Sequence, residues 1–451
     1  MKNPAHNRSR LADYLALIPQ DRTFLVTAKS QYTFGDVTAL CQRFAAEHAY
    51  LANSNCAVTS DDRESLALFF PAIDSVCQTV FLQPNDIEGA ESDFYTSAGI
   101  DYVIKLADCN FVSITAVAVN DKVSYAQQQA YLLATSGTTG TPKLANYTLD
   151  TLLATAKLDV NRGKDFNWGL AYDLNRFAGL QVYLQSAVSG ATLVVPSDAM
   201  TIAELVQLFT KSAVNALSAT PSFWRKLLMD PFHTDIPLQR ITLGGEISNQ
   251  SVLTALSRSF PQSAIIHIYA STEAGVGFVV KDQREGFPLT YLDDDQHIKC
   301  QLKVCQGVLW IKSTNGCTQL LKGKLEVDEQ GFVNTGDMVN IDGDRVFFLG
   351  RESGSINVGG NKVMPEKVEA ILEMHPSVLM ATVFAKSNSV LGALVACEII
   401  LAPDAKHIPV KELKRELLSF CREKLETFEV PALVKVVDAI KVNSTGKKVR
   451  S

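Results

Sequence analysis

Residues 135–143 read TSGTTGTPK and follow the apolar run Tyr131-Leu132-Leu133-Ala134. This order indicates a buried strand that leads into a flexible loop, rich in hydroxyl and amide donors and closed by a cation. Glycines let successive backbone N–H groups turn toward one point, and a lysine supplies a point charge suited to phosphate. The stretch therefore predicts a loop that wraps a polyphosphate, although an ordinary polar turn can have the same composition. It is not the usual P-loop, because Pro142 precedes Lys143 and Leu144 follows it.

The composition is that of a globular protein with a sizeable core. The chain has 451 residues, 47% of them hydrophobic and 20% charged, with a net charge of −6, so two or three domains are expected. No basic surface for nucleic acid is indicated, no apolar run approaches the ~18 residues of a membrane-spanning helix, and Met1–Arg10 lacks the apolar core of a signal peptide. We expect a cytoplasmic protein with no nucleic-acid partner and no integral membrane segment.

The nine cysteines are scattered along the chain and none forms a C-x-x-C pair. Most lie in apolar runs, where a reduced thiol behaves as a small hydrophobic residue. The sequence therefore predicts reduced core cysteines and gives no sign of a disulfide framework.

Short apolar runs alternate with helix-like segments through the first 110 residues, which indicates parallel βα units. The predicted strands are 24–28, 56–59, 79–83 and 102–106, and the predicted helices are 34–48 and 63–73. After the loop, residues 144–147 are expected to return as a strand, and Thr148 or Asp150 to cap a helix that runs to about Asn161.

The middle of the chain repeats this pattern, with strands predicted at 191–196, 215–219, 240–243 and 264–269 and helices at 202–209 and 224–229. Three of these strands end in turns with polar or glycine residues, namely Thr220-Pro221, Gly244-Gly245-Glu246 and Ala270-Ser271-Thr272-Glu273. Ligand groups in α/β sheets gather at the carboxyl ends of the strands. We therefore expect these three loops to face one crevice.

The character changes after about Lys299, where short strands such as 306–312 and 345–349 predict a small β subdomain. Further on, Pro365 suits the first turn of a helix over 366–374, strands are predicted at 378–385, 394–401 and 433–437, and apolar spacing predicts an amphipathic helix within 410–428. The predicted fold is α/β. It has a large N-terminal domain of parallel βα layers with a small β subdomain (1–350), a hinge (351–354), and a small mobile α+β C-terminal domain (355–451).

Six motifs, in this order and spacing, resemble those of the adenylate-forming superfamily of acyl- and aryl-CoA synthetases, peptide-synthetase adenylation domains and luciferase-like enzymes. They are TSGTTGTPK at 135–143, GGE at 244–246, YASTEAG at 269–275, NTGD at 334–337, GRESGSINVGGNKVMPEKVE at 350–369 and NSTGKK at 443–448. The resemblance covers about residues 10–451. A weaker resemblance, carried by NRFAGLQVYLQ at 175–185, is to AMP-ligases of bacterial aryl-polyene gene clusters.

The resemblance implies an ATP-dependent ligase. A carboxylic acid would attack the α-phosphorus of ATP and expel pyrophosphate, and the acyl group would then pass to a thiol of CoA or of a carrier-protein phosphopantetheine. The implied cofactors are ATP and Mg²⁺, and the implied partners are a small carboxylic acid and an acyl carrier protein acting in trans, because no carrier domain follows residue 451. The site must neutralise charge that grows in the transition state.

The resemblance also implies residue roles. Lys447 would be the catalytic lysine, Thr272 would contact the α-phosphate, and Glu273 would hold Mg²⁺. The nucleotide would be bound by Thr135, Ser136, Gly137, Thr138, Thr139 and Lys143 at the pyrophosphate, by Gly244, Gly245, Glu246 and Tyr269 at the adenine, and by Asp337 and Arg351 at the ribose. Gly359 and Gly360 would line the thiol tunnel. Lys448, next to Lys447, is expected at the surface.

The acid pocket is expected between 168–179, 218–224, 244–246 and 274–278. Its candidate residues are Trp168, Tyr172, Arg176, Phe177, Gly275 and Phe278, with Arg176 either paired to Asp173 or holding a polar group of the substrate. An aromatic or aliphatic acid is favoured over an amino acid.

The chain departs from the family pattern at Leu144, Leu149, Ala270 and, at the hinge, Ser353. Two other interpretations stay open. One is an AMP-ligase with a non-thiol acceptor, and the other is a degenerate nucleotide-binding or scaffold protein of the same fold.

Overall fold

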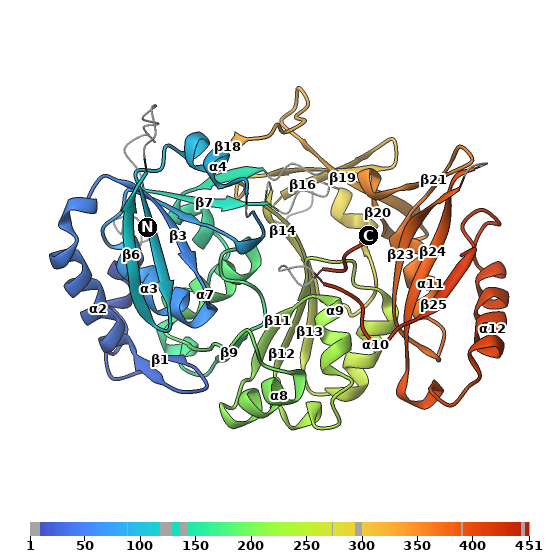
Figure 1. Cartoon of the computed structure of the whole chain (residues 1–451), viewed down its shortest axis with the longest axis horizontal. Coiled ribbons are helices and arrows are strands. Elements are labelled where there is room, and N and C mark those ends of the chain that lie inside the picture. Colours follow the sequence, from blue (N-terminus) through green and yellow to red (C-terminus); the bar gives the residue numbers. More distant parts are fainter. Residues whose placement is uncertain are drawn as a thin grey trace.

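The computed structural model describes residues 10–450 except 88, 118–128, 136–142, 273, 294–299, 389–390 and 443–446. Two large sheets, with helices between and outside them, form its first part, and two small sheets follow (Figure 1).

The first large sheet has seven strands in the order β18-β8-β7-β4-β3-β5-β6. Its strands are β3 (Asn55–Ser60), β4 (Thr79–Leu82), β5 (Tyr102–Ala107), β6 (Asn110–Ala116), β7 (Ala130–Ala134), β8 (Leu144–Tyr147) and β18 (Gln319–Lys322). β4, β3, β5 and β7 pair in parallel, whereas β6, β8 and β18 join antiparallel. The predicted strand pair on either side of the TSGTTGTPK loop is confirmed as β7 and β8.

The second large sheet has eight strands in the order β14-β13-β12-β11-β9-β10-β1-β2. Its strands are β1 (Thr23–Val26), β2 (Gln31–Thr33), β9 (Asn167–Leu170), β10 (Thr192–Val194), β11 (Ala216–Ala219), β12 (Arg240–Gly244), β13 (Ala264–Ser271) and β14 (Gly275–Val280). The six strands from β13 to β1 run parallel, and only the edge strands β14 and β2 are antiparallel. The expected parallel βα layers are therefore present.

Helices fill the space between the two large sheets. α3 (Arg63–Asp74) and α7 (Phe177–Ser189) share one apolar core with strands of both sheets and with α1 (Leu11–Leu15) and α2 (Phe34–Glu47). On the outer face of the second sheet, the core is closed by α8 (Ile202–Lys211), α9 (Pro221–Leu227) and α10 (Gln250–Ser259), and on the outer face of the first by α4 (Glu91–Ala98). Helices on both faces are what a mostly parallel sheet requires.

Local sequence signals explain where several helices begin. Thr33 and Thr201 form capping boxes with Asp36 and Glu204 at the starts of α2 and α8. Thr220 caps α9, with a proline at its first position. Because this start fixes α9 three residues before the predicted one, the helix lies directly after the carboxyl end of β11.

The helix expected to run from Thr148 to Asn161 is broken, so that prediction is wrong. α5 (Leu149–Leu153) is capped by Thr148, and α6 (Val160–Gly163) is capped by Asp159. Between them, Gln185 of α7 accepts the N–H of Lys157 at 2.9 Å and donates to its carbonyl at 3.2 Å. The backbone here bonds to α7 side chains, and a continuous helix would remove those bonds.

A small sheet confirms the predicted β subdomain. It has the order β15-β20-β19-β17-β16 and comprises β15 (Phe287–Pro288), β16 (Cys300–Cys305), β17 (Val308–Ser313), β19 (Val333–Asp342) and β20 (Arg345–Arg351). The buried side chain of Arg345 ties it to the turn after β14, because its guanidinium donates to the carbonyls of Glu285, Arg284 and Gly286 and pairs with Asp282.

The last hundred residues build their own sheet beyond the short turn Glu352–Gly354. It contains β21 (Ile356–Val358), β22 (Asn361–Val363), β23 (Val378–Asn388), β24 (Gly392–Leu401) and β25 (Leu433–Val436), with α11 (Pro365–Glu373) and α12 (Val410–Arg422) packed on it. In Figure 1 this unit, orange to red, lies at the right, and the final residues run back toward the centre of the molecule.

Cysteine placement agrees with the expected reduced thiols. Six of the nine, Cys41, Cys56, Cys77, Cys300, Cys397 and Cys421, are buried, as expected of thiols in apolar runs.

Candidate active site

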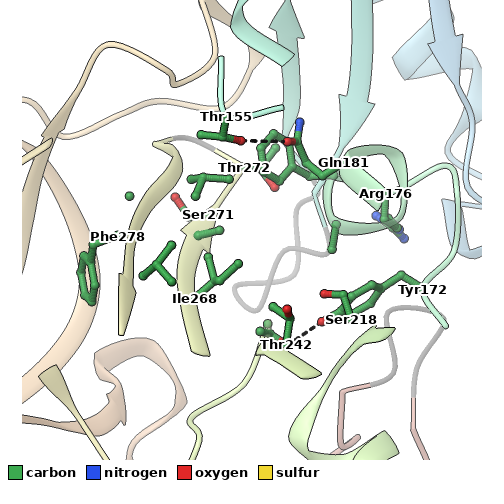
Figure 2. A pocket seen from close by; sticks show the side chains of 18 of the residues that line it. Thr155, Tyr172, Arg176, Gln181, Ser218, Thr242, Ile268, Ser271, Thr272 and Phe278 are labelled. Atoms are coloured by element: carbon green, nitrogen blue, oxygen red, sulfur yellow. Dashed lines mark hydrogen bonds between the residues drawn. The ribbon is translucent and has the colours of Figure 1, made fainter. Parts of the chain in front are cut away.

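A cavity of about 1240 Å³ lies where the carboxyl ends of β11, β12 and β13 meet the base of the TSGTTGTPK loop, the small β sheet and the C-terminal tail. Figure 2 shows Tyr172 and Arg176 on one side of it and Phe278 on the other. The strand-end turns predicted to share one crevice contribute Gly244, Gly245, Ala270, Ser271 and Thr272 to its wall. Thr220 does not line it, so only two of the three turns meet there.

Two hydrogen bonds between Thr135 and Lys143 close the loop at its base. The N–H of Thr135 donates to the carbonyl of Lys143 at 2.9 Å, and the N–H of Lys143 donates to Oγ1 of Thr135 at 3.1 Å. Both residues line the cavity. The other predicted pyrophosphate contacts, Ser136, Gly137, Thr138 and Thr139, lie outside the described residues.

Gly323, which follows β18, packs against the loop lysine. A methyl group placed on Gly323 would lie 2.7 Å from Cγ of Lys143, and the backbone there has a φ of +100°. This glycine belongs to none of the six motifs, so its position beside Lys143 could not be predicted from them.

The residues of the GGE turn differ in whether they line the cavity. Gly244 and Gly245 line the cavity, and Gly245 has a φ of +84°, which favours glycine. Glu246 does not line it. Its carboxylate accepts the N–H and the hydroxyl of Ser222 at 2.9 and 3.0 Å, and the N–H of Lys448 at 3.2 Å. The expectation that Glu246 faces the nucleotide is therefore not met.

Thr272 lies on the cavity wall, and its carbonyl accepts the hydroxyl of Tyr147, the last residue of β8. This bond joins the end of β13 to the strand that follows the loop, so the two predicted phosphate-binding segments are held together. Glu273, the predicted Mg²⁺ ligand, lies outside the described residues.

Tyr269 is placed differently from the prediction. Its ring stacks on Phe278 and on Phe348, with centroid distances of 5.1 and 5.2 Å, and Tyr269 does not line the cavity. Its hydroxyl donates to Oδ2 of Asp337 at 2.6 Å. Burial, reinforced by the Asp337 charge, raises the pKa of Tyr269 well above its usual value and keeps it a hydrogen-bond donor.

Asp337 and Arg351, the two residues predicted to contact the ribose, pair with each other, and of the two only Arg351 lines the cavity. They are opposite each other on β19 and β20, and Nε of Arg351 donates to Oδ1 of Asp337 at 3.1 Å. Arg351 lines the cavity together with Glu352 and Ser353 of the following turn. The carboxylate of Asp337, which is expected to bind the ribose, is thus also the partner of Arg351 in an ion pair.

Lys447 reaches the cavity from the C-terminal tail. A methyl group on Gly245 would lie 3.7 Å from Cε of Lys447, so this side chain lies over the GGE turn. Lys448 is not at the surface as expected, because its side chain is only 10% exposed and its ammonium pairs with Glu373 at 2.7 Å and Glu369 at 3.3 Å. Burial opposes its charge, but the two glutamates outweigh burial and raise the pKa of Lys448.

On the acid side, Trp168, Tyr172, Phe177 and Phe278 all line the cavity as predicted. The Tyr172 hydroxyl donates to the carbonyl of Gly244 at 3.1 Å, and burial raises the pKa of Tyr172. Gly275 does not line the cavity. Its φ is +68°, and a methyl group there would strike the carbonyl oxygen of Asn315 at 2.1 Å, so its role is to let two backbones pack closely.

Arg176 lines the cavity, but both terminal nitrogens of its guanidinium bind other groups of the protein. One terminal nitrogen donates to the carbonyl of Ala134 at 2.8 Å and the other pairs with Asp86. Asp173 pairs with Arg63 at 3.3 Å, so the first of the two alternatives for Arg176, a pair with Asp173, is not formed. Because Ala134 ends β7, Arg176 braces the strand that carries the loop.

Gly359 and Gly360, the predicted thiol-tunnel residues, form the two-residue turn between β21 and β22, with φ values of +57° and +93°. Positive φ at both positions is typical of a tight hairpin turn. They do not line the cavity in this arrangement.

A family model described as AMP-binding enzyme matches residues 83–312, and the model of the AMP-binding enzyme C-terminal domain matches residues 367–447. The chain belongs to the AMP-binding enzyme family. The 2-succinylbenzoate–CoA ligase of Bacillus subtilis is 22% identical to it, over 97% of this chain and 95% of the relative.

Solved structures of two AMP-binding enzymes share the fold. An anthranilate CoA ligase in complex with anthranoyl-AMP superposes with a TM-score of 0.79 and 17% identity, covering 97% of this chain and 95% of that one. The o-succinylbenzoate CoA synthetase of Bacillus subtilis, in complex with its acyl-adenylate intermediate, gives a TM-score of 0.72 and 20% identity, covering 98% and 97%.

Several wall residues of this AMP-binding enzyme lie outside the segments predicted from sequence. They come from the α5–α6 connection, from α7 and from the first three residues of β12 and β13, and include Thr155, Lys157, Gln181, Arg240, Thr242 and Ile266. The alternation of side chains along β12 and β13 could have indicated the strand residues among them. Arg240 is opposite Ala264, Thr242 is opposite Ile266 and Gly244 is opposite Ile268, so these six strand residues share one face of the sheet. The cavity therefore follows this face past Thr242 as far as Arg240.

Within the described part of the chain, no group of three or more His, Cys, Asp or Glu side chains could hold a metal ion. No helix there is long and apolar enough to cross a membrane.

Proposed function

We propose that this AMP-binding enzyme is an AMP-forming acid–thiol ligase. It would activate a small carboxylic acid as an acyl-adenylate and pass the acyl group to a thiol. The observation that carries the proposal is the convergence of Lys143, Arg351 and Lys447 on one cavity that also has an apolar, aromatic half. Cations from three separate segments suit a triphosphate, and the aromatic half suits an uncharged acyl body.

In the first half-reaction, a carboxylate oxygen of the acid bonds to the α-phosphorus of ATP, and the bond from that phosphorus to the pyrophosphate oxygen breaks. Lys143 and the loop hold the pyrophosphate end, and Thr272 contacts the α-phosphate. Lys447 lies where it can compensate the negative charge of both reactants, which repel each other without it. At ~4 Å and intermediate dielectric such a charge is worth several kcal/mol.

The described residues of the cavity fit ATP. Gly245, with its positive φ, leaves room for close backbone approach, and Asp337 supplies a carboxylate for the ribose hydroxyls once Arg351 shares it. Mg²⁺ is usually held by one or two carboxylates plus phosphate oxygens, a role we assign to Glu273. The ion would neutralise phosphate charge during the reaction.

For the acid we propose an aromatic carboxylic acid, which fits the aromatic wall formed by Trp168, Tyr172 and Phe278. Two kinds of relative act in this way by name, since they are ligases of 2-succinylbenzoate and of anthranilate. The cavity face that continues past Thr242 toward Arg240 leaves space for a substituent on the ring.

In the second half-reaction, the sulfur of CoA or of a carrier phosphopantetheine attacks the acyl carbonyl, and AMP leaves. We propose that residues 355–451 form a mobile domain that turns about Arg351–Gly354 between the two steps, and that Gly359 and Gly360 then approach the thiol arm. Such domain movements commonly gate turnover.

ATP–pyrophosphate exchange across a panel of aromatic, aliphatic and amino acids tests the first step. Exchange with aromatic acids is expected, and exchange with no acid would favour a non-catalytic scaffold. The second step is tested by offering CoA, a phosphopantetheinyl carrier, and hydroxyl or amine acceptors to the adenylate formed. Transfer only to a non-thiol acceptor would contradict the thiol-ligase assignment.

A further inference from the structure

The C-terminal unit is joined to the N-terminal part by a buried cluster of charges that lies outside the cavity. Its centre is Glu373, the last residue of α11, whose side chain is 3% exposed. Three groups donate to its carboxylate, namely Asn249 from the N-terminal part and Lys448 and the N–H of Ala381 from its own unit, and Arg225 of the N-terminal part forms an ion pair with it. Every distance lies between 2.7 and 3.1 Å.

Electrostatics agree with this geometry. Burial alone would raise the pKa of Glu373, but the charges of Arg225 and Lys448 outweigh it and hold the pKa at about 2. The carboxylate is therefore ionised at neutral pH, and the pair with Arg225 is a true ion pair between two nearly buried side chains, 9% and 3% exposed.

We propose that Arg225 and Glu373 are positioning residues that hold the C-terminal unit in the orientation that puts Lys447 into the cavity. The inference rests on the proposed two-step function. Lys448 carries the effect to its neighbour Lys447, because its ammonium is fixed by Glu373 and its N–H by Glu246. The peptide next to Lys447 is thus anchored from both sides.

The contact is also built to be reversible. When it opens, Arg225 keeps Asn249 and Ser251 as partners, each at 2.7 Å, and Glu373 keeps Lys448. After separation Glu373 still has an opposite charge and Arg225 still has two hydrogen-bond acceptors, which lowers the cost of breaking the ion pair. A contact with this property can select one orientation and still release it for the second step.

The test compares Arg225→Met with Lys367→Met. Lys367 lies on the same helix α11 and pairs with Glu429 at 2.7 Å to both oxygens, but both partners belong to the C-terminal unit. Arg225→Met is expected to slow ATP–pyrophosphate exchange at least about tenfold, since truncating a buried charge pair has effects of that size or more. Thioester formation from supplied acyl-adenylate should stay unchanged or rise. Lys367→Met should leave the ratio of the two rates unchanged, and Arg225→Lys should partly restore exchange.

Hydrogen–deuterium exchange without substrate provides a second arm that needs no catalysis. In Arg225→Met, amides of 221–227 and 378–381 should exchange faster than in the wild type, and in Lys367→Met they should not. If the hydrogen–deuterium exchange of these amides is unchanged in Arg225→Met, the proposal is overturned. Equal loss of both half-reactions in this variant would also overturn it. If no acid is activated by the wild type, the proposed function fails, while the exchange arm still decides whether Arg225 and Glu373 hold the two parts together.

Discussion

Gly323 packs directly against the side chain of Lys143, because a Cβ placed on the glycine would lie only 2.7 Å from Cγ of the lysine. The two residues are 180 positions apart, yet the lysine side chain at the end of the TSGTTGTPK loop lies against this backbone. Replacement by alanine should push Lys143 away and strain a backbone at φ +100°.

Gly323→Ala is therefore expected to raise the KM for ATP by about tenfold, because a displaced charged hydrogen bond is worth ~1.5–3 kcal/mol. Steady-state exchange kinetics at varied ATP measure it. Gly343→Ala is the control, since that glycine also has positive φ but has nothing within 4 Å of its Cβ position. Equal effects of the two variants would show that backbone strain alone is responsible.

Lys447→Ala should abolish adenylation and spare thioester formation from supplied adenylate. The loss expected is a few powers of ten, because an opposite charge at ~4 Å is worth several kcal/mol. Rapid-quench assays of each half-reaction measure the split. Lys435→Ala removes an exposed lysine of the same unit, which pairs with Glu398, and should change neither rate.

Arg176→Met should lower stability and leave the acid profile unchanged. The substitution leaves the buried carbonyl of Ala134 without its donor and Asp86 without its guanidinium, at a cost of ~2 kcal/mol. Urea unfolding measures the first effect and exchange assays with a panel of acids the second. A shifted acid preference at unchanged stability would place Arg176 in substrate recognition.

Asp74 predicts a pH dependence of stability. Burial raises the pKa of its carboxyl to about 6, although Tyr131, Leu11 and Gln129 donate hydrogen bonds to it. Because the folded pKa lies above the usual 3.8, the stabilising contribution is complete below pH 3.8 and is lost as the pH rises through 6. The loss is on the order of 3 kcal/mol.

Asp74→Asn should therefore flatten the fall of the melting temperature between pH 4 and pH 7. The slope is the readout, because an amide facing the N–H of Leu11 also shifts the absolute stability. Identical slopes in both proteins would contradict a raised pKa at this position.

Ile266→Phe tests the depth of the acid pocket. Ile266 lies on the cavity face directly opposite Thr242, so a larger side chain should lower kcat/KM for ring-substituted acids about tenfold more than for the unsubstituted acid. Competition between the two acids measures the ratio. Ile265→Leu, on the opposite face of β13 in the outer core, should leave it unchanged.

Periodicity and motifs predicted most elements, including β7 and β8 around the loop, β11 to β13, and α8, α11 and α12. They failed where a long-range contact overrides a local pattern. Gln185 interrupts the helix expected through Lys157, and Glu373 buries Lys448, which looks solvated from its neighbours alone. Motif residues line the cavity where the backbone conformation decides their position, as at Gly245. They do not line it where the side chain bonds to a residue of another segment, as Glu246 does to Ser222.

The pairing of β18 with β8 has a consequence for the order in which the chain folds. Leu320 is opposite Ala145, and Gln319 is opposite Asn146, so the strand after the phosphate loop remains an edge until residues 319–322 have left the ribosome. An unpaired edge strand invites pairing with other chains. A nascent chain stalled before Gln319 is therefore expected to associate with chaperones longer than one stalled after the small β sheet, and the nucleotide site would be among the last parts of the N-terminal region to mature during synthesis.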